Sequence, residues 1–194
     1  MKRPLLPSSS PGFTLIELMV GVVILGVLLA VAAPSLTGLI ERRRVIAAAD
    51  EVAGLFTYAR SEANVLTETV NLHLEPVPSS VGAFSCVRVS AAATTDLCKC
   101  SLAADQVCRL GGGKLLREYL LPRSTGVKFD ATGNWIFVPY VVSFQRGAFN
   151  PVNNVGVTVT GTHTGAQLRV EYNNVGRVRI CSPDGAIGGY ARCG

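Results

Sequence analysis

A long uncharged apolar segment follows Phe13, and a single acid lies near its start. No charged residue occurs from Leu18 to Ile40, and thirteen Leu, Ile, Val or Phe side chains lie between Phe13 and Ala33. Such a run contributes roughly 4 to 8 kcal/mol of insertion free energy, whereas Glu17 costs at most about 3 kcal/mol. The segment is therefore predicted to enter a membrane together with its carboxylate, which is expected to have a cationic partner there.

The residues at the start of this segment, Gly12 to Glu17, have the sequence GFTLIE. Followed by a long apolar run, this motif resembles the processing signal of type IV pilins and type II secretion pseudopilins. The resemblance implies that a prepilin peptidase cuts between Gly12 and Phe13 and that the new amino terminus is methylated. It also implies that Glu17 pairs with the amino terminus of a neighbouring subunit during assembly. An ordinary signal anchor is the alternative.

Residues 1–12 are basic and interrupted by proline, unlike the apolar core of a secretory signal. They are expected to form a prepilin leader that is cleaved. Arg42, Arg43 and Arg44 follow the apolar run, so counting charges alone favours the opposite orientation. We give more weight to the processing motif and to the cysteines downstream. They predict a single-pass protein of the bacterial inner membrane, with its domain in the periplasm and, once assembled, in a pilus at the cell surface.

A periodic apolar pattern replaces the continuous one after the arginines. Its members are spaced by four and three residues, which is one stripe of an amphipathic helix. They are Val45, Ala49, Val52, Phe56, Ala59, Ala63 and Leu66. We predict one helix from about Phe13 to about Asn64, bent near Pro34. Residues 13–40 form its transmembrane and assembly half, and residues 41–66 form its amphipathic half.

Short β-like runs separated by turn residues fill the remaining part of the chain, residues 67–194. The predicted strands are Thr69–Leu74, Phe84–Val89, Leu115–Leu121, Gly126–Phe129, Trp135–Val138, Val141–Phe144, Val155–Thr160, Leu168–Tyr172 and Arg177–Cys181. Such strands cannot cover themselves, so they are expected to form one or two antiparallel sheets against the helix stripe. The predicted fold class is α+β, with a long amino-terminal helix on a sheet domain, which resembles the type IV pilin fold.

Six cysteines lie beyond the apolar segment, where an exported domain meets oxidising conditions. We predict that Cys181 pairs with Cys193, because this bond closes a loop rich in glycine. The pairing of Cys86, Cys98, Cys100 and Cys108 is left open, and residues 91–113 are predicted to form a disulfide-bonded insertion. A zinc site is the competing interpretation, but the cysteine spacing matches no usual zinc motif, so no metal is expected.

Two segments near the carboxyl terminus, Val142–Gly147 and Gly176–Cys181, resemble the FimT and GspH branch of minor pilins and pseudopilins. Gly176 to Arg179 also reproduces the Gly-Arg-x-Arg signature of FimT-like minor pilins implicated in DNA uptake. On a strand, Arg177 and Arg179 share one face about 7 Å apart, close to the spacing of successive phosphates. Arg192 is expected nearby if Cys181 and Cys193 are joined, and the predicted DNA-binding residues are Arg177, Arg179 and Arg192.

The function predicted from these features is a FimT-like minor pilin of a type IV pilus that binds double-stranded DNA non-specifically for natural transformation. Residues 123–194 hold seven Lys or Arg against three acids, which favours this function. The alternative is a structural subunit, either a FimU-like priming minor pilin or a GspH-like pseudopilin of type II secretion. In that case the arginines protect a strand edge or aid solubility.

The expected partners are other pilins or pseudopilins, the inner membrane and the prepilin peptidase, with double-stranded DNA added by the first hypothesis. Catalysis is not expected, because His73 and His163 lie in neither a metal-ligand pair nor a Gly-x-Ser-x-Gly context, and no paired carboxylates stand out. We therefore expect no catalytic residue and no cofactor.

Overall fold

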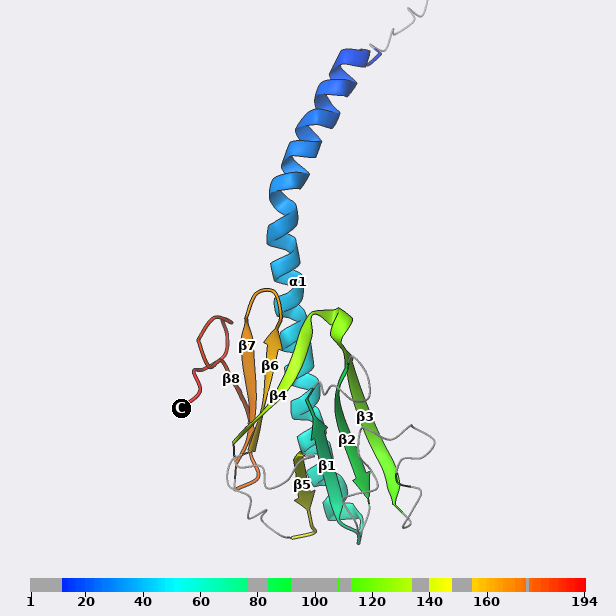
Figure 1. The fold of residues 1–194 in the computed structure, drawn as a ribbon, viewed down its shortest axis with the longest axis vertical. Helices are drawn as coiled ribbons and strands as arrows, with labels where there is room; N and C mark the ends of the chain where they lie inside the picture. Colours follow the sequence, from blue (N-terminus) through cyan, green and yellow to red (C-terminus); the bar gives the residue numbers. More distant parts are fainter. Residues whose placement is uncertain are drawn as a thin grey trace, which may run out of the picture. The chain divides into compact units, whose positions relative to one another are not determined.

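The computed structural model describes residues 12–76, 84–91, 108, 113–133, 140–147, 155–173 and 175–194. The chain divides into two compact units, Met1–Thr37 and Gly38–Gly194. A single helix, α1, spans Leu15–Val65. The second unit contains the carboxyl-terminal part of α1 and all the strands (Figure 1).

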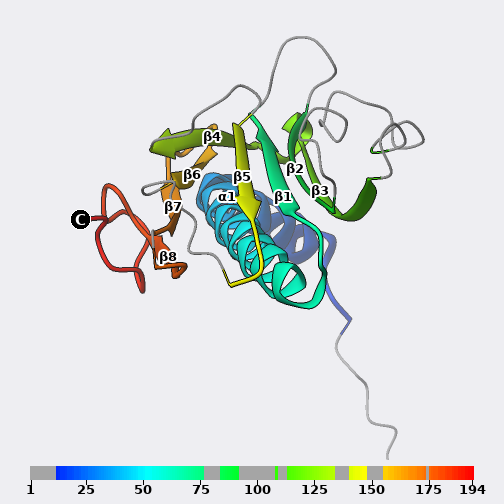
Figure 2. The ribbon, with the colours of Figure 1, turned by 90° about the horizontal axis from the view of Figure 1, so that it is seen from below.

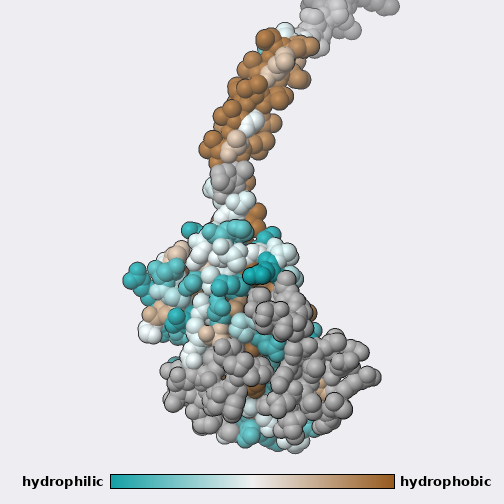
Figure 3. Space-filling view, viewed as in Figure 1, coloured by the Kyte–Doolittle hydropathy of each residue, from teal (hydrophilic) through white to brown (hydrophobic). Residues whose placement is uncertain are grey.

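The first unit is the apolar part of α1, and its large aliphatic side chains are exposed (Figure 3). A capping box starts the helix: Glu17 accepts the N–H of Thr14 at 3.0 Å, and the Thr14 hydroxyl accepts the N–H of Glu17 at 3.3 Å. α1 is bent between Leu15–Val31 and Ser35–Val65. Neither piece alone, nor any other single helix of the described residues, is long and apolar enough to cross a membrane. The two pieces together meet that requirement by length and composition.

The second half of α1 is amphipathic, as its periodicity predicts. The buried side chains of its stripe are Val45, Ala48, Ala49, Val52, Leu55, Phe56, Ala59 and Ala63. They form one core with the inward side chains of the strands, which cover one side of this half of the helix (Figure 2). Burial of this stripe against the sheets, rather than helix propensity, stabilises the helix here.

In the described part of the chain, eight strands form two antiparallel sheets of four strands each. Sheet A has the order β3-β2-β1-β5, and sheet B has the order β4-β6-β7-β8. The strands are β1 Val70–Glu75, β2 Phe84–Ala91, β3 Lys114–Pro122, β4 Val127–Gly133, β5 Tyr140–Phe144, β6 Val155–Gly161, β7 Gln167–Tyr172 and β8 Val178–Cys181. A short 3-10 helix, η2 Arg123–Thr125, joins β3 to β4 and so connects the two sheets.

An aromatic cluster joins the helix to both sheets. The ring of Tyr172 on β7 stacks on Phe56 of α1 with centroids 5.5 Å apart, and Phe144 on β5 meets Tyr172 edge-on at 5.5 Å. Such pairs add roughly 0.5 to 1.5 kcal/mol to the burial of their surface. They fix β7, and with it the neighbouring strand β8, against the helix.

Glu41 ties the start of the amphipathic half to the turn between β6 and β7. Its carboxylate accepts the N–H of His163 at 2.8 Å and the N–H of Thr164 at 2.9 Å, and it is only 5% exposed. Burial alone raises the pKa of Glu41, but the hydrogen bonds from His163 and Thr164 outweigh burial and lower that pKa below its ordinary value. The side chain is therefore ionised at neutral pH.

The α+β fold class, the long helix and most of the predicted strands are confirmed. Most strand ends differ from the prediction by one or two residues, and β4 differs by more. β4 continues past Phe129 to Gly133, because it pairs with β6 along its whole length. β8 starts at Val178 rather than at Arg177, because a turn takes up the preceding residues. The run predicted at Trp135–Val138 lies outside the described residues.

The predicted insertion at residues 91–113 also lies largely outside the described part of the chain. Within the described part, Cys86 on β2 and Cys108 are each disulfide-bonded. The pairing of these cysteines was left open by the sequence. A disulfide between Cys181 and Cys193 is present, as predicted, with an S–S distance of 2.00 Å.

Candidate functional site

Polar side chains alternate with core side chains along β7 and β8. On β7 the residues Leu168, Val170 and Tyr172 are buried, so Arg169 and Glu171 point to the opposite face of sheet B. We call this face, which points away from α1, the outer face of sheet B. The alternation continues on β8, where Val178 and Ile180 pack on the core and Arg179 is exposed. Charged side chains from two strands therefore lie together on one surface.

The turn between β7 and β8 is closed by hydrogen bonds around Asn173. Its backbone N–H donates to the carbonyl of Arg177 at 3.1 Å, and its side-chain oxygen accepts the N–H of Arg177 at 2.8 Å. The N–H of Gly176 donates to the carbonyl of Asn173 at 2.9 Å. These bonds fix the backbone of Arg177 just before β8 begins.

Gly176 is required at this turn for two reasons. Its φ of 78° lies in the left-handed region that favours glycine. A Cβ atom there would also lie 2.8 Å from Cζ and Nη1 of Arg60, a residue of α1 that donates a hydrogen bond to the Gly176 carbonyl. The first residue of the Gly-Arg-x-Arg motif therefore anchors the arginines that follow it to the helix.

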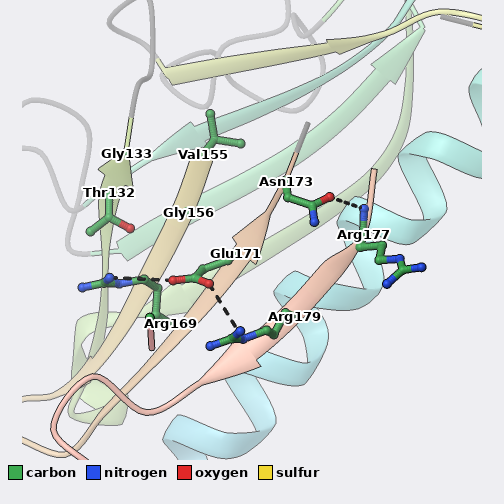
Figure 4. Close-up of a pocket in the computed structure, with 10 residues that line it drawn as sticks. Thr132, Gly133, Val155, Gly156, Arg169, Glu171, Asn173, Arg177 and Arg179 are labelled. Atoms are coloured by element: carbon green, nitrogen blue, oxygen red, sulfur yellow. Dashed lines mark hydrogen bonds and ion pairs between the residues drawn. The ribbon is translucent and has the colours of Figure 1, made fainter. Parts of the chain in front are cut away.

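The outer face of sheet B is hollowed beside these arginines (Figure 4). The hollow has a volume of about 500 Å³. Its lining residues come from β4, β6, β7, the turn, β8 and the chain's last residue: Thr132, Gly133, Val155, Gly156, Arg169, Glu171, Asn173, Arg177, Arg179 and Gly194. A Cβ atom on Gly156 would meet the Thr132 hydroxyl at 2.7 Å, so a glycine is needed for the close packing of β4 and β6 at this edge of the hollow.

Three arginines and one acid set the electrostatics of the hollow. Glu171 is 3.8 Å from Arg169 Nη1 and 3.9 Å from Arg179 Nε. Arg179 also donates from Nη2 to the carbonyl of Arg192 at 2.9 Å, which orients its guanidinium. The Arg177 guanidinium forms neither an ion pair nor a hydrogen bond with any described residue. The hollow therefore has an excess of positive charge and can bind an anion.

Arg192 is near these residues, but it does not line the hollow. The disulfide between Cys181 and Cys193 and the bridge between Ser182 and Arg192 hold its backbone beside β8. Its guanidinium instead lies against the loop between Ser182 and Arg192, with Nε 3.0 Å from the position that a Cβ atom on Gly185 would take. The sequence predicts that Arg192 lies close to Arg179. In the structure the contact is made by the Arg192 backbone, whose carbonyl accepts a hydrogen bond from Arg179.

Asp184 in the same loop is held as a carboxylate. The hydrogen bond from the backbone N–H of Ala186 is the main cause that lowers its pKa, with further contributions from the Ser182 hydroxyl and from the charge of Arg192. The Arg192 charge is therefore partly offset within its own loop. For this second reason, Arg192 adds less than its full positive charge to the site formed by Arg177 and Arg179.

The residues of the predicted processing site lie at the start of the first unit. Phe13 is 88% exposed, and a Cβ atom on Gly12 would meet no atom within 4 Å. The bond between them is thus accessible in the isolated chain. Glu17, the predicted assembly residue, is exposed, and its carboxylate is engaged by Thr14.

One group of possible metal ligands lies next to the hollow. The Glu171 carboxylate and the sulfur atoms of Cys181 and Cys193 are within 4.8 Å of one another. Both sulfur atoms belong to the disulfide, so neither provides the thiolate that binds a metal.

Arg169, Glu171, Asn173 and Arg60 were not singled out as site residues in the sequence. The alternation in residues 167–172 could have placed Arg169 and Glu171 together on the solvent face of their strand, but the pairing that brings this face beside Arg179 is seen only in the structure. The role of Arg60 depends on a contact across 116 positions in the chain, and no local pattern reveals it.

Comparison with known proteins gives one sequence match and two structural ones. Residues 8–33 match the prokaryotic N-terminal methylation motif. The type IV minor pilin FimU of Pseudomonas aeruginosa is similar at 15% identity and a TM-score of 0.48, covering 73% of this chain and 91% of that one. The minor pseudopilin EpsH of the Vibrio cholerae type 2 secretion system is similar at 12% identity and a TM-score of 0.45, covering 72% and 97%. No curated protein sequence is significantly similar.

The methylation motif covers the predicted processing site and the first turns of α1. The rest of the chain supplies the second feature, an amphipathic helix half packed on antiparallel sheets. The motif and its apolar helix indicate anchoring in a membrane and assembly with similar subunits. Together these observations show a prokaryotic N-terminal methylation motif at the start of a long helix, whose second half packs on an α+β domain.

Proposed function

We propose that this chain is a FimT-like minor pilin of a type IV pilus that binds DNA on the outer face of sheet B during natural transformation. The observation that carries the proposal is the convergence of Arg169, Arg177 and Arg179 on one hollow. Two of them belong to the Gly-Arg-x-Arg motif, and Arg60 holds the glycine of that motif in place. The site is thus presented by a strand that is fixed to the core.

The chemistry of the hollow suits the DNA backbone better than the bases. Guanidinium groups bind phosphate oxygens with paired hydrogen bonds, and neighbouring arginines on one strand match the spacing of successive phosphates. The described lining residues include no aromatic side chain on which a base could stack. We therefore expect binding that is independent of sequence, as an uptake receptor requires.

The strength and the salt dependence of this binding follow from the number of contacts. Three arginines that each neutralise one phosphate give a slope of log K against log salt of about −3 on duplex DNA. The full-length chain in a non-ionic detergent should therefore shift unrelated duplexes of equal length equally, and less as salt is raised. A gel shift across a salt series checks this. Strong preference for one sequence, or retention that is insensitive to salt, would contradict backbone binding.

Membership of a filament requires that the leader be removed. We propose that a prepilin peptidase cuts between Gly12 and Phe13 and that Glu17 then pairs with the amino terminus of a neighbouring subunit in the inner membrane. The exposure of Phe13 and the motif at residues 8–33 support this.

Mass spectrometry of the chain recovered from the membrane tests the processing step. We expect an amino-terminal peptide that begins at Phe13 and is heavier by one methyl group. A chain that keeps residues 1–12, or that begins at another residue, would mean that it does not enter a filament by this route.

A structural subunit, FimU-like or GspH-like, is the second candidate. Glu171 favours it, because this acid already partners Arg169 and Arg179 within the chain. In that case the full-length chain co-purifies with other minor pilins or pseudopilins and does not retain DNA at any salt concentration.

A further inference from the structure

Glu171 lies in the middle of the hollow, between two of its three guanidinium groups (Figure 4). It follows Arg169 by two positions on β7, so both side chains share the outer face, and it pairs directly with Arg179 on β8. Its Oε1 is 3.8 Å from Arg169 Nη1, and its Oε2 is 3.9 Å from Arg179 Nε. One carboxylate is thus shared by two of the groups that would meet a phosphate.

Both ion pairs are too long for a charge-assisted hydrogen bond, which requires about 2.7 to 2.9 Å. Arg169 Nε is buried and has no hydrogen-bond partner in the described part of the chain. Arg179 uses Nη2 for the carbonyl of Arg192, and its Nε remains 3.9 Å from Glu171. The side chains of Arg169 and Arg179 are 33% and 52% exposed, so part of each guanidinium can reach an incoming anion, although Arg169 Nε itself is buried.

The geometry points to Glu171 as an internal competitor of the DNA phosphate, a residue that weakens binding and eases release. This inference rests on the proposed DNA binding and concerns its strength. A phosphate bound by Arg169 and Arg179 brings a like charge close to Glu171, and the repulsion destabilises the complex. No described acid forms an ion pair with Arg177, so this arginine is available in both the free and the bound state.

Replacing Glu171 by Gln tests whether this carboxylate competes with the DNA phosphate for Arg169 and Arg179. The amide keeps the size of the side chain and removes its charge, so E171Q should bind duplex DNA roughly tenfold more tightly than the wild type at about 0.1 M salt. Its salt slope should stay close to that of the wild type, because the same three arginines neutralise phosphates in both proteins.

The matched control is Asp130→Asn. Asp130 lies on β4, is half-exposed, pairs with Lys128 at 3.2 Å and does not line the hollow. The Asp130→Asn substitution removes the same formal charge from the same domain. Its effect on DNA affinity should stay below about twofold, as expected for a charge that salt screens from the bound DNA. The melting temperature of E171Q should change by no more than about 3 °C, because partly exposed ion pairs contribute little. If E171Q does not fold, Glu171→Thr, which suits a strand, takes its place.

The outcomes separate this inference from the proposed function. Tighter binding by E171Q than by D130N supports the competitor, even if the wild type itself retains no DNA. A wild type that binds DNA and an E171Q variant that binds no better overturn the competitor and leave the proposed function intact. Equal gains in E171Q and D130N, or no retention by any variant, also overturn it.

Discussion

Gly176→Ala should lower the free energy of unfolding of the globular unit by about 2.5 to 5 kcal/mol. The left-handed φ of 78° costs a residue with a Cβ atom roughly 1 to 2 kcal/mol. The methyl group also displaces the Arg60 guanidinium and breaks its hydrogen bond to the Gly176 carbonyl, a bond to a charged group worth about 1.5 to 3 kcal/mol. Denaturant unfolding of the full-length chain, followed by circular dichroism, measures the change.

Gly165→Ala is the matched control for backbone strain. Its φ of 67° is similar, but a Cβ atom there meets nothing within 4 Å, so only the strain is expected. In an Arg60→Ala background the cost of Gly176→Ala should fall to that of Gly165→Ala, because the guanidinium is no longer displaced. Equal costs for Gly176→Ala and Gly165→Ala in the wild-type background would show that the Arg60 contact contributes nothing.

DNA affinity should fall together with stability in Gly176→Ala. The turn from Asn173 to Gly176 fixes the backbone of Arg177, and a displaced turn moves this arginine relative to Arg179. Gly165→Ala lies in the turn between β6 and β7, away from the hollow, and should leave DNA affinity unchanged. Measured together, the stability and the DNA affinity of these two variants therefore test whether the glycine of the motif holds its arginines in position.

Local periodicity was sufficient to predict the helix and most of the strands. The stripe from Val45 to Ala63 is buried as its spacing indicates, because side chains three and four positions apart share one face of a helix. The alternation of Val178 and Arg179 is likewise seen in β8. The division into two sheets and the strand orders could not be predicted, because they depend on pairings between segments far apart in the chain.

Part of the site was predicted from local patterns, and the rest was missed because it depends on strand pairing. The motif identifies Arg177 and Arg179, and the loop rich in glycine identifies the disulfide of Cys181 and Cys193. Glu171 and Arg169 belong to a neighbouring strand whose register with β8 cannot be read from either strand alone. A pattern of two arginines therefore predicts a more basic surface than the one observed, in which the Glu171 carboxylate lies between Arg169 and Arg179.

The side chain of Arg192 shows another limit of spacing arguments. A disulfide fixes the distance between two Cα atoms, here 5.0 Å, and so brings the backbone of Arg192 next to β8. It does not determine the direction of the neighbouring side chain, which lies against Gly185. We therefore expect Arg192 to contribute less to DNA binding than Arg177 or Arg179.

The central claim is that the outer face of sheet B binds DNA through the arginines of the Gly-Arg-x-Arg motif. Replacing Arg177 and Arg179 by Gln should lower DNA affinity roughly 50-fold at about 0.1 M salt and make the salt slope shallower by about two units. Both side chains are exposed, so the fold should be unaffected. The matched control is Lys114→Gln with Arg123→Gln, which removes two charges from exposed positions that do not line the hollow.

A gel shift of the full-length chain with one duplex, across a salt series, compares the wild type with these two double variants. We predict that the Arg177 and Arg179 variant loses most of its retention and about two units of slope, while the control variant stays close to the wild type. Unchanged retention and slope in the Arg177 and Arg179 variant, or an equal loss in both variants, would contradict DNA binding at this site.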